Sequence, residues 1–243
     1  MKEKLLFLAI VLFISTTIWA QKNTIPLIGS EAPSFKANST DGKIKFPSDF
    51  GESWKILFSH PADFTPVCSS ELLELAFLQP KLDELGVKFA VISTDDVEMH
   101  KLWVEYLEDL NYKNRGKIKI DFPLIEDNEG QISETYGMLH RPVSSYRDIR
   151  GVFIIDDKNI VRSVNFYPVE IGRNMQEIVR TIEALQTTQE DLVYTPANWE
   201  KGDDVIVPYN PTFNAKATDA ESLQDYYKMG NRIWFKKVDE NDK

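Results

Sequence analysis

Short apolar runs alternate along this chain with segments of helical periodicity. Trp54–Ser59 is mostly apolar, as in a buried strand. In the segment after it, leucines recur at steps of three and four and give a helix one apolar face; they are Leu72, Leu75, Leu78, Leu82 and Leu85. The pattern predicts a strand that leads into a helix. Pro80 should kink or divide that helix, because proline lacks the backbone N–H.

Further apolar runs predict more strands, and two more periodic segments predict helices. Val87–Ser93 is nearly continuous in apolar residues, whereas Ile44 and Phe46 alternate with lysines as in a short edge strand. The other strands are expected at residues 121–126, 151–155 and 160–166, and the helices at residues 97–110 and 175–185. The turn at residues 156–159 should close the last two strands into an antiparallel hairpin. Strands alternating with helices, plus a hairpin, predict an α/β sandwich with a mixed central sheet.

The composition changes after Thr187. We expect a brief strand at residues 204–207, a helix over Ser222–Met229 and a final strand over Arg232–Val238. Residues 188–243 are too few to hold much of a core of their own. We therefore expect this arm to pack on the main domain or on a second subunit.

The first 20 residues have the features of a targeting segment. Lys2 and Lys4 precede an apolar run from Leu5 to about Ser15, and Ala20 offers a small residue for cleavage. A membrane anchor is the alternative, but the apolar stretch is short for a span, which needs about 20 apolar residues. We predict a signal peptide over residues 1–20 and an exported protein, periplasmic or secreted. After cleavage, no stable membrane association is expected.

Charge and composition exclude several classes of function. The formal net charge is −10, and this acidic balance argues against a nucleic acid or an anionic membrane as partner. The single cysteine rules out an intramolecular disulfide and a Cys-x-x-Cys redox site. The three histidines, His60, His100 and His140, are widely spaced, so we expect no metal site.

Cys68 is the candidate nucleophile. Thr65 suits a helix N-cap and Pro66 the first helical position, which places Cys68 within the first turn of the predicted helix. There the free backbone N–H groups and the helix dipole favour a reactive thiolate. The other interpretation is an inert cysteine, since most lone cysteines are small buried hydrophobes.

The residues around Cys68 carry a family resemblance. Pro61, Thr65 and Cys68 match Pro-x-x-x-Thr-x-x-Cys, the active-site motif of peroxiredoxins, and the string from His60 to Cys68 resembles the one-Cys subfamily. Three later segments resemble further parts of that family in the same order; they are Arg150–Asp156, Tyr167–Asn174 and Thr195–Trp199. The match extends from about residue 28 to about residue 211.

The resemblance implies a thioredoxin-like fold. It makes residues 27–187 the peroxiredoxin domain and residues 188–243 a C-terminal extension that helps to form a homodimer or a higher homo-oligomer. It also implies a thiol-dependent peroxidase in which Cys68 attacks hydrogen peroxide or an organic hydroperoxide and becomes a sulfenic acid. No cofactor and no metal are expected. The alternative is a non-enzymatic thioredoxin-fold oligomer or chaperone.

Roles for the other candidate residues follow from the same resemblance. Thr65 should hydrogen-bond to the thiolate or the peroxide, and Pro61 should shape a water-poor wall. Arg150 should lie beside Cys68 and stabilise developing charge. Supporting residues are Arg173, Glu71 and His60. In two-Cys peroxiredoxins a resolving cysteine occupies the place that Thr195 holds here, so an external thiol must reduce the sulfenic acid.

Overall fold

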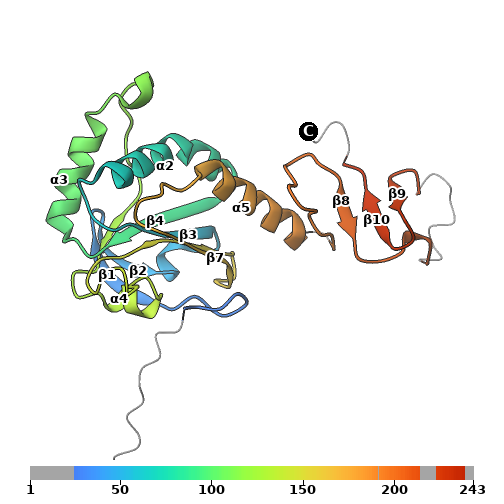
Figure 1. The fold of residues 1–243 in the computed structure, drawn as a ribbon, viewed down its shortest axis with the longest axis horizontal. Helices are drawn as coiled ribbons and strands as arrows, with labels where there is room; N and C mark the ends of the chain where they lie inside the picture. The colour runs from blue at the N-terminus through green and yellow to red at the C-terminus, as the bar shows by residue number, and fades with distance from the viewer. Residues whose placement is uncertain (1–24, 191, 214–222, 239–243) are drawn as a thin grey trace, which may run out of the picture.

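The computed structural model describes residues 25–190, 192–213 and 223–238. Seven strands form one sheet in the order β2-β1-β5-β4-β3-β6-β7 (Figure 1). Their bounds are β1 Phe35–Ser39, β2 Gly42–Phe46, β3 Trp54–Ser59, β4 Val87–Ser93, β5 Leu124–Glu126, β6 Arg150–Ile155 and β7 Val161–Tyr167. Neighbours among β3, β4 and β5 are parallel, and all other neighbours are antiparallel. The predicted mixed sheet, its edge strand and its hairpin are confirmed.

The described helices are α2 Pro66–Glu84, α3 Val97–Glu108, α4 Gln131–Thr135 and α5 Met175–Glu190, with short 3-10 turns at Ser48–Phe50, Tyr112–Asn114 and Pro211–Phe213. The three longer helices lie where the apolar periodicity predicts them. Pro80 does not divide α2, which continues through it to Glu84. The buried side chains of Leu75 and Leu82 lie on either side of Pro80 in one core, and this shared packing holds the helix together across the missing hydrogen bond.

Strand β3 lies at the centre of the fold. All six of its residues are buried, because β4 and β6 flank it and both faces of the sheet are covered. Ile56 and Phe58 belong to a core shared with α2, α3 and α5, whereas Leu57 belongs to a second core with Tyr136. The chain that leaves the end of β3 is therefore held from several sides, and that chain carries Cys68.

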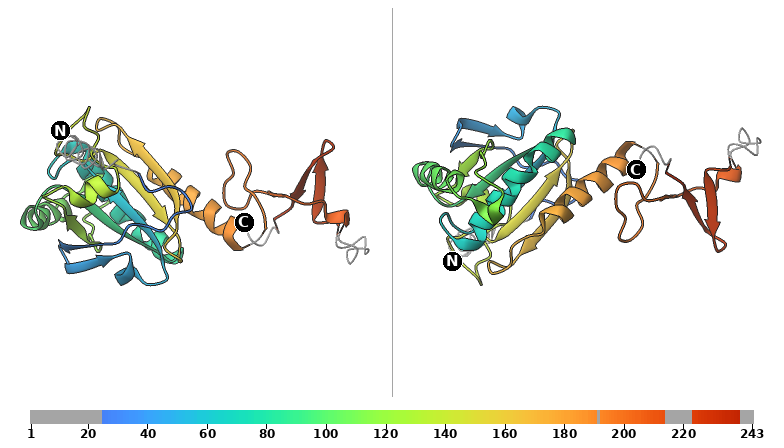
Figure 2. Two further views of the ribbon diagram at one scale, coloured as in Figure 1. Left: turned by 90° about the horizontal axis from the view of Figure 1, so that it is seen from below. Right: turned by 90° about the horizontal axis from the view of Figure 1, so that it is seen from above.

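The C-terminal arm forms a small unit of its own. Strands β8 Val205–Val207, β9 Tyr226–Met229 and β10 Ile233–Lys236 form an antiparallel sheet in the order β8-β10-β9. Val193 and Trp199 pack with β8 in a third core, which also includes Ala184 of α5. Figures 1 and 2 show this unit standing apart from the main domain, joined to it through α5. Within one chain the arm therefore packs on the outer end of α5.

One prediction for the arm is wrong. The expected helix over Ser222–Met229 is the strand β9 at Tyr226–Met229, while Ser222 itself lies outside the described residues. Cross-strand packing decides the conformation, since the rings of Tyr227 and Phe235 stack at 5.1 Å between centroids. The strands predicted near residues 204–207 and 232–238 are confirmed.

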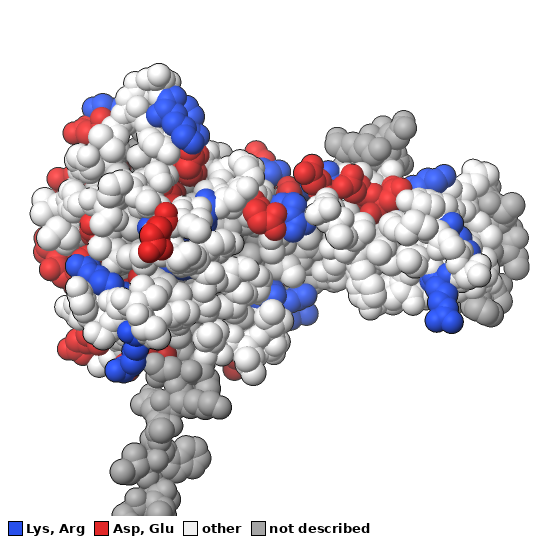
Figure 3. All heavy atoms as spheres, viewed as in Figure 1, with Lys and Arg blue, Asp and Glu red and all other residues white. Residues whose placement is uncertain are grey.

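The predicted signal peptide, residues 1–20, falls outside the described residues. None of the helices in the described part of the chain is both long and apolar enough to cross a membrane. On the face drawn in Figure 3, acidic and basic side chains are interspersed over the main domain. Acidic side chains gather on that face where the main domain meets the arm.

Candidate active site

Cys68 lies in the first turn of α2, directly after the loop that leaves β3. Thr65 occupies the N-cap position and Pro66 opens the helix, as the sequence predicts. The loop is tightly wound, because Phe64 adopts a left-handed backbone conformation with φ 55°. Cys68 is fully buried with a free thiol, although it lies near a helix end.

The two other motif residues, Thr65 and Pro61, lie in the loop that precedes Cys68. The hydroxyl of Thr65 donates to the carbonyl oxygen of Ala62 at 2.8 Å and makes no capping hydrogen bond to α2. This bond closes the loop on itself and fixes the side chain in the turn before Cys68. Pro61 is half-buried in the same loop. The catalytic roles expected for both residues stay predictions.

Arg150 brings a positive charge to the sulfur from the first position of β6. Its Nη1 lies 3.3 Å from Sγ of Cys68 and donates to Oε2 of Glu71 at 2.6 Å. Its Nε and Nη2 donate to the carbonyl oxygen of Val169 at 3.1 and 2.6 Å. Partners on both sides therefore fix the guanidinium, and a fixed positive charge beside Sγ favours the thiolate.

Glu71 joins Arg150 to a second arginine. The carboxylate accepts from the backbone N–H, Nε and Nη2 of Arg173 at 2.7, 2.9 and 2.7 Å. The guanidinium of Arg173 also stacks over the ring of Phe58, 3.2 Å from its centroid. The structure thus brings together four predicted site residues, Cys68, Glu71, Arg150 and Arg173, and all of them are buried.

The charges of this group are interdependent. Burial alone would raise the pKa of Glu71, but the hydrogen bonds and charge of Arg173 outweigh it and hold that pKa below its ordinary range. Burial lowers the pKa of Arg173 to about 10 against the opposing effect of Glu71, so Arg173 stays protonated at neutral pH. Two cations then face one carboxylate. The buried group therefore carries a net positive charge beside Sγ, which favours negative charge on the sulfur.

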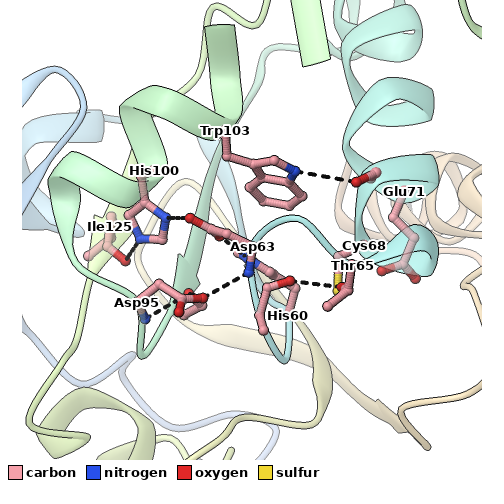
Figure 4. A network of polar contacts seen from close by, with 12 residues as sticks. His60, Asp63, Thr65, Cys68, Glu71, Asp95, His100, Trp103 and Ile125 are labelled. Carbon is pink, nitrogen blue, oxygen red and sulfur yellow. Dashed lines mark hydrogen bonds and ion pairs between the residues drawn. The ribbon is translucent and has the colours of Figure 1, made fainter. Parts of the chain in front are cut away.

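A second polar group holds the loop before Cys68 (Figure 4). Asp63 lies at its centre, with Oδ1 2.8 Å from Nε2 of His60 and Oδ2 2.7 Å from Nδ1 of His100. The backbone N–H of Asp63 donates to Asp95 at 2.8 Å, and Asp95 in turn accepts from Arg147 at 2.6 Å. These bonds tie the loop to the end of β4, to α3 and to the segment before β6.

The protonation states in this second group follow from burial and geometry. Burial lowers the pKa of His60 despite Asp63, so its ring is neutral and its Nε2–H donates to Asp63. Burial would raise the pKa of Asp63, but hydrogen bonds from His100 and His60 outweigh it, and the pKa is lowered. The Nε2 of His100 faces the carbonyl oxygen of Ile125 at 3.2 Å, so both nitrogens of His100 face acceptors.

Sequence reasoning missed most of this second group. His60 is a sequence candidate, and Asp63 three residues later is a signal within the motif itself. His100 and Asp95 give no local signal, because they come from α3 and from the turn before it. Among the described residues, His60, Asp63 and Asp95 are spaced as metal ligands could be. Their oxygens already accept hydrogen bonds from neighbouring groups, and Arg147 beside Asp95 disfavours a cation.

Comparisons with known proteins agree with this geometry. The AhpC/TSA family model matches residues 28–164, and the model for the C-terminal domain of 1-Cys peroxiredoxin matches residues 184–222. A Methanosarcina mazei peroxiredoxin is 44% identical over 185 residues, which are 76% of this chain and 84% of the relative.

Two solved structures are similar over most of the chain. The yeast mitochondrial 1-Cys peroxiredoxin has a TM-score of 0.76 at 36% identity, covering 88% of this chain and 100% of the other. A Cys-to-Ser variant of Arenicola marina peroxiredoxin 6 has a TM-score of 0.75 at 31% identity, covering 88% and 99%. This chain therefore belongs to the AhpC/TSA family of peroxiredoxins, within its 1-Cys branch, and is a thiol-dependent peroxidase with a thioredoxin-like fold.

Proposed function

We propose that Cys68 reduces hydrogen peroxide and organic hydroperoxides and that an external thiol regenerates it. The observation that carries this proposal is the 3.3 Å contact between Nη1 of Arg150 and Sγ of Cys68, inside a buried group that is neutral only with a thiolate. The non-enzymatic alternative, an oligomer or chaperone without chemistry, offers no reason to bury two arginines around one sulfur.

The reaction begins with attack of the Cys68 thiolate on one oxygen of the peroxide. The O–O bond breaks as the S–O bond forms, which leaves a sulfenic acid on Sγ and an alkoxide or hydroxide that takes up a proton as it leaves. Negative charge moves from sulfur to the leaving oxygen, and the guanidinium of Arg150 is placed to follow it. Arg173 and Glu71 keep that guanidinium in place.

Resolution requires a thiol from outside the chain, because Cys68 is its only cysteine. A first thiol condenses with the sulfenic acid to a mixed disulfide and releases water. A second thiol then attacks the external sulfur and restores the Cys68 thiol as the two external sulfurs pair. The similar yeast protein is described as resolved through glutathione and thioredoxin systems. We infer the same class of reductant here, a low-molecular-weight thiol or a thioredoxin-like dithiol, and no further cofactor or metal.

Two further features are proposed rather than observed. The arm exposes apolar side chains at Leu192, Tyr194 and Met229, and we infer that they pack on a second copy of this chain in a homodimer or larger homo-oligomer. We also infer that residues 1–20 direct export to the periplasm or out of the cell. In such a compartment the dependence on a dedicated thiol would be strong.

Intact-mass spectrometry tests the proposal. Reduced protein treated with one equivalent of peroxide should gain one oxygen atom, and an added thiol should convert it to a mixed disulfide. Cys68→Ser should gain neither and should stop peroxide consumption while the circular dichroism spectrum stays unchanged. Excess peroxide without thiol should add second and third oxygens at Cys68. Sustained turnover without any added reductant would contradict the proposed resolution step.

A further inference from the structure

Ser59 is the last residue of β3 and is fully buried. Its hydroxyl donates to the carbonyl oxygen of Ile149 at 2.7 Å and accepts from the backbone N–H of Gly151 at 2.8 Å. These two backbone groups stand immediately before and after Arg150. A single side-chain oxygen therefore holds the chain on both sides of the arginine that contacts Cys68.

This arrangement replaces strand pairing at the point where it stops. The antiparallel pairing of β3 with β6 runs from Lys55 opposite Ile155 to Phe58 opposite Val152. Ser59 and Gly151 lie one position beyond the last pair, and there the hydroxyl provides the hydrogen bonds. Gly151 leaves the room for it, since a Cβ at that position would lie 2.9 Å from the hydroxyl oxygen.

The backbone of Ser59 reaches the second arginine as well. Nη1 of Arg173 donates to the carbonyl oxygens of Ser59 and Gly151, each at 2.8 Å. The hydroxyl of Ser59 thus fixes the backbone of Arg150, and its carbonyl fixes the guanidinium of Arg173. Ser59 therefore bonds both to the backbone beside Arg150 and to the side chain of Arg173.

We propose that Ser59 is a positioning residue that sets where the Arg150 guanidinium stands relative to Sγ of Cys68. This inference rests on the proposed role of Arg150 in peroxide reduction. Glu71 and Val169 hold the far end of the Arg150 side chain, and Ser59 holds the near end at the backbone. Without the hydroxyl, a buried N–H and a buried C=O lose their partner and the backbone moves to satisfy them. A misplacement of about 1 Å in such a site costs on the order of a hundredfold in rate.

A double-mutant cycle tests the proposal. Ser59→Ala should lower the second-order rate constant for hydrogen peroxide about tenfold, a smaller effect than a full 1 Å misplacement because Glu71 and Val169 remain. In the Arg150→Met background the same change should cost less than about twofold, because no guanidinium is left to position. An equal loss in both backgrounds, or no loss in the wild-type background, would overturn the proposal.

Ser39→Ala is the matched control. Ser39 is also buried, and its hydroxyl also bridges a backbone carbonyl and a backbone N–H, of Gly42 and Asp41 at 2.8 and 3.2 Å, in the turn after β1. This variant should lose stability to a similar degree and keep the wild-type rate constant. A similar rate loss in Ser39→Ala would reduce the Ser59 effect to general destabilisation and overturn the proposal.

A readout independent of peroxidase activity separates this inference from the proposed function. The alkylation rates of Cys68 by anionic iodoacetate and by neutral iodoacetamide give a ratio that rises when a cation stands beside Sγ. Ser59→Ala should lower that ratio and Ser39→Ala should not, whether or not peroxide is consumed. If Ser59→Ala does not fold, Ser59→Thr, which keeps the hydroxyl, should keep the wild-type ratio. A lowered ratio in Ser59→Thr, or an unchanged ratio in Ser59→Ala, would overturn the proposal.

Discussion

The two buried polar groups on either side of Cys68 differ in how their charges balance. Around Asp63 the two carboxylates have partners of their own, since Asp63 bonds to His60 and His100 and Asp95 pairs with Arg147. Around Glu71 two guanidiniums share one carboxylate, and balance is reached only through the sulfur. The group around Asp63 does not depend on the sulfur and holds the loop in place. The group around Glu71 has a net positive charge unless the sulfur carries a negative charge, so its electrostatic field acts on the reacting atom.

The largest expected effect comes from removing the shared carboxylate. Glu71→Gln removes the carboxylate that two buried guanidiniums share, and breaking a buried ion pair in this way costs about 3 kcal/mol. Urea unfolding at neutral pH measures the loss. Glu74→Gln, one turn along α2 with a carboxylate that reaches solvent, should cost less than about 1 kcal/mol. Equal losses in the two variants would mean that the buried group is not held together by Glu71.

The next effect should appear in rate rather than in stability. Arg150→Lys keeps a positive charge but loses the planar fork that contacts Cys68, Glu71 and Val169 at once. We expect the second-order rate constant for peroxide to fall about a hundredfold, or ~2.7 kcal/mol of transition-state stabilisation. Stopped-flow kinetics measures this second-order rate constant. Arg180→Lys, at a half-buried position of α5, is the control, and a wild-type rate constant in Arg150→Lys would remove Arg150 from the reaction.

A substitution in the group around Asp63 should reduce stability more than it reduces the rate constant. Asp63→Asn replaces the anion that holds both His60 and His100, and we expect the free energy of unfolding to fall by about 2 kcal/mol. The rate constant should fall by less than about tenfold, because Arg150 keeps its own partners. Asp109→Asn, at an exposed position, should change neither quantity. A rate loss as large as that of Arg150→Lys would place Asp63 in the chemistry and end the distinction between the two groups.

The smallest expected effect concerns a buried carboxyl that belongs to neither of the two polar groups. Asp148 is fully buried, and among the described residues neither of its oxygens has a hydrogen-bond partner. Burial raises its pKa from 3.8 to about 8, so the folded chain binds this proton where the unfolded chain releases it. The stability that this proton contributes is complete below about pH 4 and is lost as the pH rises to about 8.

Asp148→Asn should therefore flatten the pH dependence over that range and stabilise the protein at pH 7 by about 1 kcal/mol. Unfolding at several pH values between 4 and 8 measures both effects. An unchanged slope in Asp148→Asn would show that this carboxyl is ionised in the folded state.

The sequence predicts the features that depend on contacts between near neighbours in the chain, and it does not predict those that depend on distant contacts. Cys68 follows Thr65 and Pro66 within one turn, so local rules place it at the helix start. Arg150 is 82 positions away from Cys68, and only the family resemblance suggests that they meet. Ser59 and His100 bond to groups 90 and 37 positions distant, and nothing in their own neighbourhood marks them. The wrong helix at Tyr226–Met229 has the same origin, since its pairing with β10 decides its conformation.

The charge balance around Glu71 also makes the fold sensitive to the redox state of one atom. When the thiolate becomes a neutral sulfenic acid, the two guanidiniums again outnumber the carboxylate, and an unbalanced charge is left inside the protein. We therefore expect oxidation of Cys68 to lower the free energy of unfolding of the structure around Glu71.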